Sequence, residues 1–216
     1  IHTMGDIAMA SLRSEDWLYK MFGIDAELLI DHAWGYETCR MSDIKNYHSE
    51  EHSLSNGQVL MRNYSFDEAL VIVREMTDNL VLDLFEKGLV TSSLTLWIAY
   101  DHRYEHEASK GTVKLERGSN SSKKIIDAVE DLYLRIADRY TGIRRIEVCA
   151  NRVAPESYVQ YSLFDDSKQT DKERHLQEAV LNVKQRYGKN AIMRGSNLLE
   201  CSTYRERNEQ IGGHRA

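Results

Sequence analysis

Two strand-helix-strand patterns follow one another between residues 53 and 153, and they limit the possible folds more than any other feature of the sequence. The first begins with a strand over residues 53–62 that leads into a capping box, Ser65-x-x-Glu68. The helix that follows has apolar residues at helical spacing and ends at Gly88. The next strand has the two-residue period of a half-buried strand, with Leu94, Leu96 and Ile98 on one side and Thr95 and Trp97 on the other.

The second pattern repeats this order. A polar stretch over residues 101–110 predicts a hairpin loop, and residues 112–116 predict the third strand. A Ser/Asn cluster at residues 119–122 caps a helix that we expect to end at Gly142, and residues 145–153 predict a fourth strand. The apolar side of this helix is formed by Ile125, Val129, Leu132, Ile136 and Tyr140.

These elements together predict an α+β fold. The βαββαβ order is that of the split βαβ arrangement, a four-stranded antiparallel sheet with two helices on one face and the other face open. The predicted domain spans residues 53–155, because the only proline, Pro155, follows the last strand.

Short helical patterns precede this domain. Residues 1–40 predict three short helices, with Thr3 as the first N-cap, a second start at Ser14 and a third helix over residues 25–34. Since the pattern begins abruptly and buries little, we interpret it as the remnant of a domain truncated at its front edge. Residues 41–52 lack any period and predict a polar linker.

A different organisation follows Pro155. Residues 156–170 predict an extended peptide, and residues 171–216 predict a helical and polar C-terminal tail. A second capping box, Thr170-x-x-Glu173, opens the tail's helix, and the polar residues beyond it are expected to order only against a partner or the rest of the protein. The side of this helix that should pack is formed by Leu176, Ala179, Val180, Val183 and Tyr187.

Charge and composition exclude several classes of protein. The net charge of −6 excludes a strongly basic DNA-binding protein. Residues 1–50 hold 4 basic and 9 acidic side chains, whereas residues 119–152 hold 7 basic and 5 acidic ones, so a local basic face is compatible with the sequence. The sequence has no apolar run of the roughly 20 residues that span a bilayer, and no leader, so we expect no membrane partner. Three scattered cysteines without CxxC spacing favour reduced thiols and a cytoplasmic location.

A short peptide within residues 156–170 has the composition of a docking motif. It consists of Gln160, Tyr161, Ser162, Leu163 and Phe164. The Leu-Phe pair supplies apolar area to bury in a partner's pocket, and the glutamine amide fixes orientation at the rim. QYSLF resembles the pentapeptide by which bacterial polymerases and repair proteins bind the ring-shaped sliding clamp. The alternative is a strand or loop that Leu163 and Phe164 fix to the protein's own core.

Three further segments resemble one family of DNA polymerases. IHTMGDIA (residues 1–8) resembles the second half of the helix-hairpin-helix in the thumb of Y-family translesion DNA polymerases. EEHSLSNGQVL (residues 50–60) resembles the first strand of that family's little-finger domain, which follows a linker and has the element order given above. RERNEQIGGHRA (residues 205–216) resembles the C-terminus of the family's UmuC/ImpB/MucB/SamB-like branch. With the docking peptide, these stretches occur in the family's order along nearly the whole chain.

This resemblance implies that double-stranded primer-template DNA and a bacterial sliding clamp are the partners. The open sheet face of the little finger is expected to contact DNA phosphates without a base code, and the thumb is expected to offer backbone N–H groups at a helix N-terminus. For each residue the alternative is an ordinary solvated position. The residues implied on matching positions are Thr3, Met4 and Gly5 in the thumb, Ser53, Ser55 and Gly57 on the first strand, Lys114 and Arg117 on the third, and Lys124 and Arg145 beyond.

The resemblance also implies what this chain lacks. The catalytic palm and the fingers fall outside it, so we expect no catalytic residue, no metal site and no cofactor here. Mg²⁺ is expected in the palm of an error-prone, lesion-bypassing parent polymerase that acts in DNA repair. His52 stands where the family often has lysine, which weakens the expected grip on DNA.

Other readings of the residues remain open. Asp101, His102, His106 and Glu107 have ligand chemistry, but they fall in a predicted loop, which disfavours a metal site. Trp97 and the tyrosines suit a base-stacking platform, although their spacing favours core packing. The fold alone is also compatible with a ferredoxin-like regulatory domain or a protein-interaction module without DNA binding. A ligand-binding domain needs an enclosed pocket, and an interaction module ignores DNA.

Overall fold

The computed structural model describes residues 1–46, 53–156, 167–211 and 214–215. They belong to two compact units, residues 1–50 and residues 51–216. The first unit begins with α1 (Met4–Phe22), which ends at Gly23. Thr3 is its N-cap, as predicted, and Ser14 has non-helical backbone angles that divide the helix where the sequence predicts a second start.

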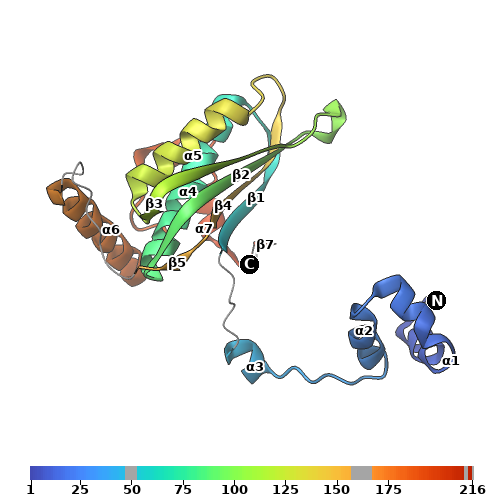
Figure 1. Ribbon diagram of the computed structural model, residues 1–216. Coiled ribbons are helices and arrows are strands. Elements are labelled where there is room, and N and C mark those ends of the chain that lie inside the picture. The colour runs from blue at the N-terminus through green and yellow to red at the C-terminus, as the bar shows by residue number, and fades with distance from the viewer. Residues whose placement is uncertain (47–52, 157–166, 212–213, 216) are drawn as a thin grey trace. The chain divides into compact units, whose positions relative to one another are not determined.

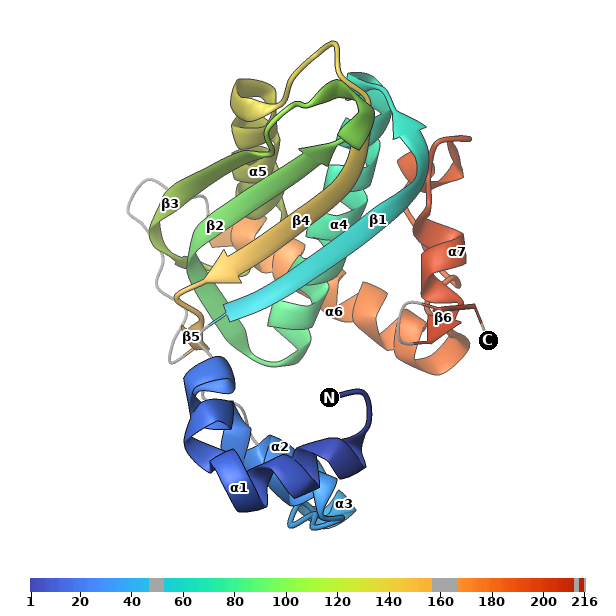
Figure 2. The same ribbon diagram turned by 90° about the vertical axis from the view of Figure 1, so that its right-hand side faces the viewer.

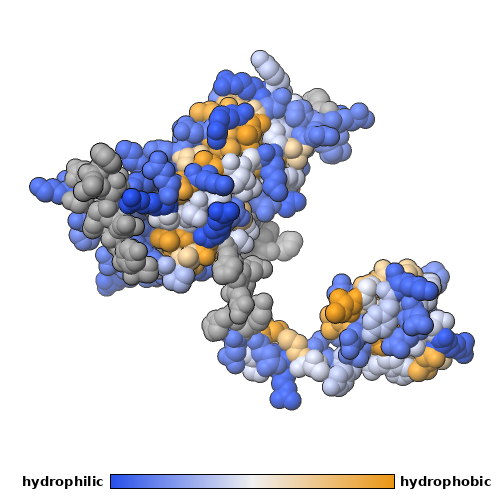
Figure 3. Space-filling view, in the orientation of Figure 1, coloured by the Kyte–Doolittle hydropathy of each residue, from blue (hydrophilic) through white to orange (hydrophobic). Residues whose placement is uncertain are grey.

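The remainder of the first unit has little core. α2 (Asp25–Ala33) packs against α1, and the buried hydrophobic side chains among residues 1–46 are Ala8, Leu18 and Ala26. Large apolar side chains therefore remain on its surface (Figure 3). A short helix, α3 (Met41–Asn46), occupies part of the segment in which the sequence predicts only a linker.

The second unit is built on an antiparallel sheet with helices on one face (Figures 1 and 2). Its strands pair in the order β1-β4-β2-β3, and the short β5 (Ala154–Pro155) pairs with the start of β2. The predicted α+β class, with an antiparallel sheet and helices, is confirmed, whereas this pairing order goes beyond the sequence-based prediction. The main elements are β1 (Ser53–Tyr64), α4 (Phe66–Glu86), β2 (Leu89–Tyr100), β3 (Ser109–Ser119), α5 (Ser122–Ile136) and β4 (Ile143–Asn151).

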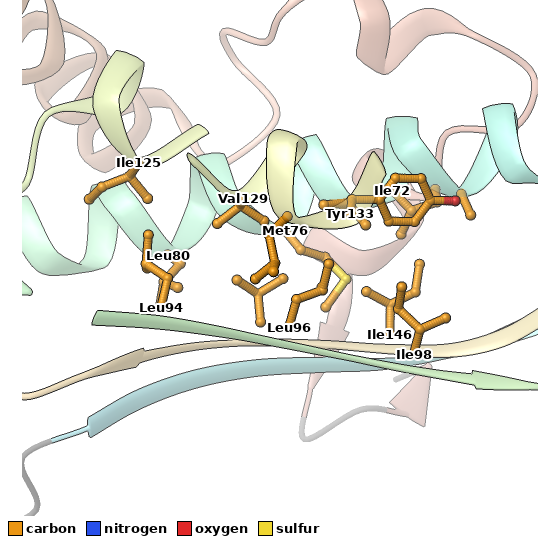
Figure 4. Close-up of a cluster of buried hydrophobic side chains, with 14 of the residues drawn as sticks. Ile72, Met76, Leu80, Leu94, Leu96, Ile98, Ile125, Val129, Tyr133 and Ile146 are labelled. Carbon is orange, nitrogen blue, oxygen red and sulfur yellow. The ribbon is translucent and has the colours of Figure 1, made fainter. Parts of the chain in front are cut away.

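The core lies between the sheet and the two helices (Figure 4). Leu94, Leu96 and Ile98 are fully buried there, as their alternation along β2 predicts. The predicted capping box of Ser65 and Glu68 is present at the start of α4. The helices contribute Ile72, Met76 and Leu80 from α4 and Ile125, Val129 and Tyr133 from α5.

α5 ends earlier than the sequence predicts. Its last residue is Ile136, and Tyr140, predicted on the apolar side of the helix, is 96% exposed. The Asp138 carboxylate accepts hydrogen bonds from the backbone N–H groups of Tyr140 and Thr141, each at 2.7 Å. A side chain that satisfies nearby backbone donors competes with the helix and ends it.

The C-terminal helix begins earlier than predicted. α6 (Ser167–Tyr187) starts at Ser167, so Thr170 lies inside the helix rather than at its N-cap. Glu173 accepts hydrogen bonds from the Ser121 hydroxyl at 3.0 Å and from the backbone N–H of Lys123 at 2.8 Å, both at the start of α5. The second predicted capping box is therefore wrong, because Glu173 caps a different helix.

The packed side of α6 also differs from the prediction. Leu176 and Tyr187 are 64% and 67% exposed, whereas Gln177 is 7% exposed and donates a hydrogen bond to the backbone oxygen of Asn120. A polar side chain is tolerated in this position because its hydrogen bond is made. The stop at Gly188 agrees with the sequence, since this glycine has a φ of 98°.

The polar tail beyond α6 packs back onto the second unit. A 3-10 turn (Gly195–Leu198) and α7 (Tyr204–Asn208) lead to the paired strands β6 (Gln210–Ile211) and β7 (His214–Arg215). Tyr204 is buried, and its hydroxyl accepts a hydrogen bond from Lys184 on α6. Arg207 donates to the Asn56 side chain and Thr203 contacts Gln58, so the tail is joined to β1. Across the described part of the chain, every helix is too short or too polar to cross a membrane.

Candidate nucleic-acid interface

Within the second unit, one face of the sheet is covered by none of the described helices, and we call it the open face (Figure 2). The register aligns its side chains in rows that cross the four strands. One row is Lys114, Ser93, Asn151 and Ser53. The next row is Thr112, Thr95, Cys149 and Ser55. The third row is Lys110, Trp97, Glu147 and Gly57. Nine of these and neighbouring side chains line a shallow cavity of about 560 Å³: Ser93, Thr95, Trp97, Lys110, Thr112, Arg145, Glu147, Cys149 and Asn151.

Small hydroxyl groups form the middle of the open face. The Thr95 and Thr112 hydroxyls lie 2.9 Å apart across β2 and β3, and Asn151 donates a hydrogen bond to the Thr95 hydroxyl at 2.8 Å. The Asn151 backbone oxygen accepts from the Thr91 hydroxyl at 2.6 Å. These hydrogen bonds hold the polar side chains close to the strands. A flat ligand or a curved backbone can therefore approach the sheet closely.

Cys149 is a neutral member of this surface. Burial raises the pKa of its thiol, and the neighbouring Glu147 carboxylate raises it further. The thiol donates to Asn151 Oδ1 at 3.2 Å. At neutral pH this position therefore contributes a weak hydrogen-bonding group and no charge.

The positive charges stand at the sides of the hydroxyl rows. Lys110 and Lys114 are exposed on β3, an edge strand. Arg145 lies on β4, where its guanidinium carbon is 5.0 Å from the centre of the Trp97 ring, a cation–π contact. Arg145 also faces Glu147 on the same strand, with 3.5 Å between Nη2 and Oε2. The open face is thus polar, and its hydroxyl rows are flanked by the cations Lys110, Lys114 and Arg145 and by the Glu147 carboxylate.

The open face brings together half of the residues implied by the sequence. Ser53, Ser55 and Gly57 alternate along β1 on its exposed side, and Lys114 and Arg145 lie on β3 and β4 of the same face. These five positions form one continuous surface.

The other implied residues are not part of this surface. Arg117 is exposed on β3 beyond the register shift that separates Lys114 from Ser119. Lys124 lies in the first turn of α5, in the helix layer on the other side of the sheet. Thr3, Met4 and Gly5 belong to the first unit.

The start of α1 already holds a carboxylate. Asp6 Oδ2 accepts hydrogen bonds from the backbone N–H groups of His2 and Thr3 at 2.8 and 3.1 Å. These bonds lower the pKa of Asp6. The Thr3 N–H is therefore occupied by the protein's own anion, and the N–H groups of Met4 and Gly5 remain as the first-turn donors without an intrahelical acceptor.

Of the nine residues that line the open-face cavity, only Arg145 was among the predicted site residues. The other eight were missed by the sequence-based prediction: Ser93, Thr95, Trp97, Lys110, Thr112, Glu147, Cys149 and Asn151. Trp97 corrects an expectation, because it lies on the open face and not among the core side chains. The two-residue alternation along β2 carries this signal, since Trp97 is out of phase with Leu96 and Ile98. Lys110 and Thr112 alternate with Lys114 in the same way, but the strand's start at Ser109 was needed to recognise them.

The weak metal candidates have structural roles. The Asp101 carboxylate is buried and accepts hydrogen bonds from Arg103 Nε at 2.9 Å and from the Asn63 amide at 2.5 Å. His106 Nε2 lies 3.4 Å from the Asp138 carboxylate. Among the described residues, no group of three or more His, Cys, Asp or Glu side chains is arranged to hold a metal ion.

The predicted clamp-binding residues, Gln160, Tyr161, Ser162, Leu163 and Phe164, lie outside the described residues. On one side of them, the Glu156 carboxylate pairs with Arg174 at 2.7 Å and accepts from Asn120. On the other side, α6 begins at Ser167. Glu156 thus belongs to a packed part of the second unit.

Comparisons with known proteins agree on a family. A family model described as the impB/mucB/samB family C-terminal domain matches residues 51–163. The chain is 26% identical over 218 residues to a protein named DNA polymerase IV 2 from Bacillus subtilis (strain 168), covering 99% of this chain and 50% of that protein. A protein of the same name from Halalkalibacterium halodurans is 21% identical over 215 residues, with the same two coverages. The chain therefore spans about half the length of the curated relatives it matches.

A solved structure of a Y-family DNA polymerase chimera is also similar to this chain. The match has a TM-score of 0.40 and 17% identity, and it covers 72% of this chain and 42% of that one.

Proposed function

The chain belongs to the impB/mucB/samB C-terminal domain family, and from this premise we propose that its open face binds the backbone of double-stranded primer-template DNA. The resemblance to Y-family DNA polymerases expected from the sequence is confirmed by the family match. The observation that carries the proposal is the row structure of the open face, in which hydroxyl side chains lie between Lys110 and Lys114 on one side and Arg145 on the other.

Such a surface suits phosphates better than bases. Hydroxyl groups and cations donate hydrogen bonds to phosphate oxygens whatever the base sequence, so they position a duplex without reading it. Ser55 and Gly57 on β1 leave room for the backbone to approach, because neither carries a large side chain. The exposed backbone N–H groups of Met4 and Gly5 offer a second, separate phosphate contact of the same kind.

The binding is expected to be weak and strongly dependent on salt. The net charge of −6 repels DNA at long range, and only the local cations of the open face release counterions from it. A binding face of this kind suits a protein that holds a duplex while moving along it.

Binding of a labelled primer-template duplex, followed by fluorescence anisotropy at several salt concentrations, tests this proposal. The triple substitution Lys110→Ala, Lys114→Ala and Arg145→Ala should weaken binding about 30-fold. It should also lower the slope of log K against log salt by about three, one for each lost phosphate contact.

A matched control removes the same charge from the helix layer. This control is the triple variant Lys87→Ala, Lys172→Ala and Lys189→Ala, in which the three replaced lysines are exposed residues in or near α4 and α6. If this control loses as much affinity as the open-face variant, or if the wild type does not bind the duplex, the proposed interface is wrong.

We also propose that Gln160, Leu163 and Phe164 tether the protein to a bacterial sliding clamp, with Tyr161 and Ser162 as spacers. The support is the sequence pattern, together with the flanking Glu156, which an ion pair with Arg174 holds in the second unit. The variant Gln160→Ala, Leu163→Ala, Phe164→Ala should lose micromolar binding to the clamp, whereas the spacer variant Ser162→Ala should keep it. Equal binding by all forms would assign the peptide to packing within the protein.

In the longer protein, we propose a template-directed, error-prone DNA polymerase that acts in translesion synthesis and DNA repair. The support is the family membership and the name of the relatives, DNA polymerase IV 2. In this proposal, a catalytic palm outside these residues would carry out phosphoryl transfer with its Mg²⁺ ions, and the part described here would hold the duplex DNA product.

A further inference from the structure

Glu147 is at odds with a phosphate-binding role. Among the nine described residues that line the open-face cavity it is the one carboxylate. It stands in the centre of the sheet, with Trp97 opposite on β2 and Gly57 opposite on β1. A negative charge there repels a phosphate that Lys110 and Arg145 attract.

The contacts of Glu147 indicate what it does instead. Arg145 precedes it by two residues, so both side chains project from the same face of β4. Their closest N–O distance is 3.5 Å, and the two side chains are 50% and 36% exposed. An exposed pair at that distance is weak, so an incoming anion can displace the carboxylate.

Two neighbours fix the position of this pair. The Arg145 guanidinium lies over the Trp97 ring at 5.0 Å, which limits where it can move. The Glu147 side chain lies beside β1 at Gly57, because a Cβ built at Gly57 would be in ordinary van der Waals contact with Glu147 Cγ, at 3.7 Å. The pair therefore lies between the Trp97 ring and the part of β1 at Gly57, where the strand has no side chain.

We propose that Glu147 acts as a built-in competitor for Arg145 and so limits the affinity of the open face for DNA. In the free protein the carboxylate neutralises Arg145 and keeps it over Trp97. In the complex a phosphate takes the place of the carboxylate on the guanidinium. Glu147 is thus a positioning residue that acts through Arg145, and this inference rests on the proposed function.

The first test is the duplex-binding titration with Glu147→Gln in the full chain. The amide keeps the size of the side chain but removes its charge, so we expect binding about fivefold tighter at constant salt. Glu178→Gln, at an exposed position on α6, changes the net charge equally and should leave affinity unchanged. Weaker binding by Glu147→Gln would overturn the inference, because it would mean that the carboxylate contacts DNA directly, for example a cytosine amino group.

The second test asks whether the gain passes through Arg145. In an Arg145→Gln background, Glu147→Gln should increase the affinity for the duplex by less than half of the gain that it gives in the wild type. A double-mutant cycle measures this difference. An equal gain in both backgrounds would overturn the inference, since the carboxylate would then act only as a general repulsive charge. Loss of binding in the lysine and arginine variants without any effect of Glu147→Gln would reject the competitor and leave the interface intact. Absence of duplex binding in every form, wild type included, would reject both.

Discussion

At the scale of single residues, Glu68 shows how one carboxylate joins a helix cap to an ion pair. It accepts a hydrogen bond from the backbone N–H of Ser65 at 2.9 Å and binds the Arg62 guanidinium at 2.6 and 3.1 Å. These contacts lower its pKa to about 2, with the Arg62 hydrogen bonds as the largest cause. The ionised form is therefore the one that stabilises the start of α4.

We expect Glu68→Gln to lower the free energy of unfolding by about 1 kcal/mol at pH 7, a value reduced for solvent screening of a partly exposed pair. The amide can still complete the cap, so the loss reports the charge. Because the pKa in the folded state is below its ordinary value of 4.5, this stability is fully present above that pH and is lost as the pH falls toward about 2.

Urea unfolding at pH 7, 4 and 2.5 measures this difference. The gap between wild type and Glu68→Gln should close with acid, while the neighbouring exposed carboxylate, replaced in Asp67→Asn, should show a smaller change. A gap that stays constant over this range would contradict the role of the Glu68 charge.

At the scale of elements, Glu173 on α6 caps α5. Its carboxylate accepts hydrogen bonds from the Ser121 hydroxyl and from the backbone N–H of Lys123. Both donors lie at the N-terminus of α5, where the first backbone N–H groups have no acceptor within the helix. A side chain of α6 thus supplies a cap for α5, although the two helices are far apart in the sequence.

Removal of this cap should loosen both helices. We expect Glu173→Ala to cost about 1–2 kcal/mol of unfolding free energy and Glu173→Gln less, because the amide oxygen can still accept. Glu178→Ala, one turn further along α6 at an exposed position, serves as the control in the same thermal and urea unfolding experiments. A loss in the control equal to that of Glu173→Ala would assign the effect to helix propensity.

The docking of the C-terminal tail depends on one aromatic side chain. Tyr204 is 1% exposed, whereas Tyr187 at the end of α6 is 67% exposed. We expect Tyr204→Ala to destabilise the second unit by about 3 kcal/mol and Tyr187→Ala to change it by less than about 0.5 kcal/mol. Limited proteolysis should then cut the tail of the Tyr204→Ala protein faster. Resistance equal to that of the wild type would show that the tail is held by its polar contacts alone.

The elements also show what the sequence could predict. Periodicity and caps identified both central helices and the strands, because Leu94 to Ile98 and the Ser65 cap report on local geometry. The same capping motif failed at Thr170, where a distant helix competes for Glu173. The prediction that α5 includes Tyr140 was wrong for a related reason, because the Asp138 carboxylate accepts a hydrogen bond from the backbone N–H of Tyr140 and so competes with a further helical turn.

The candidate site was predictable in part. The positions on β1 followed from the resemblance. Lys110, Thr112 and Trp97 became visible only when the register placed Lys110 opposite Trp97, Thr112 opposite Thr95 and Trp97 opposite Glu147. The role of Gly111, between Lys110 and Thr112, also became visible only in the structure. A Cβ at Gly111 would lie 2.8 Å from Leu132 Cδ1 on α5, so this position faces the helix closely. Which side of an edge strand faces a helix is a tertiary property that alternation alone leaves open.

At the scale of the whole molecule, the two units differ in how much they bury. Among residues 1–46, the described part of the first unit, three hydrophobic side chains are buried, while large apolar side chains such as Leu12, Ile24 and Trp34 are at least half exposed. Burial this small cannot offset the conformational entropy of the ordered chain.

We therefore expect a peptide of residues 1–50 to lack cooperative unfolding, and residues 51–216 alone to unfold with the midpoint of the second unit in the full chain. Circular dichroism and differential scanning calorimetry of the two fragments measure this. A sharp thermal transition in the 1–50 peptide would show that its helices are stable without a partner surface.

The pairing of β1 with β4 determines when the second unit can be completed. Ser53 lies opposite Asn151, and α4, β2, β3 and α5 are all synthesised between them. Contacts so distant in sequence form late, and until then an unpaired strand edge is exposed to other chains. A ribosome that stalls before β4 therefore releases a chain with no open face and a free β1 edge, so interrupted translation should yield aggregates and not weakly binding protein.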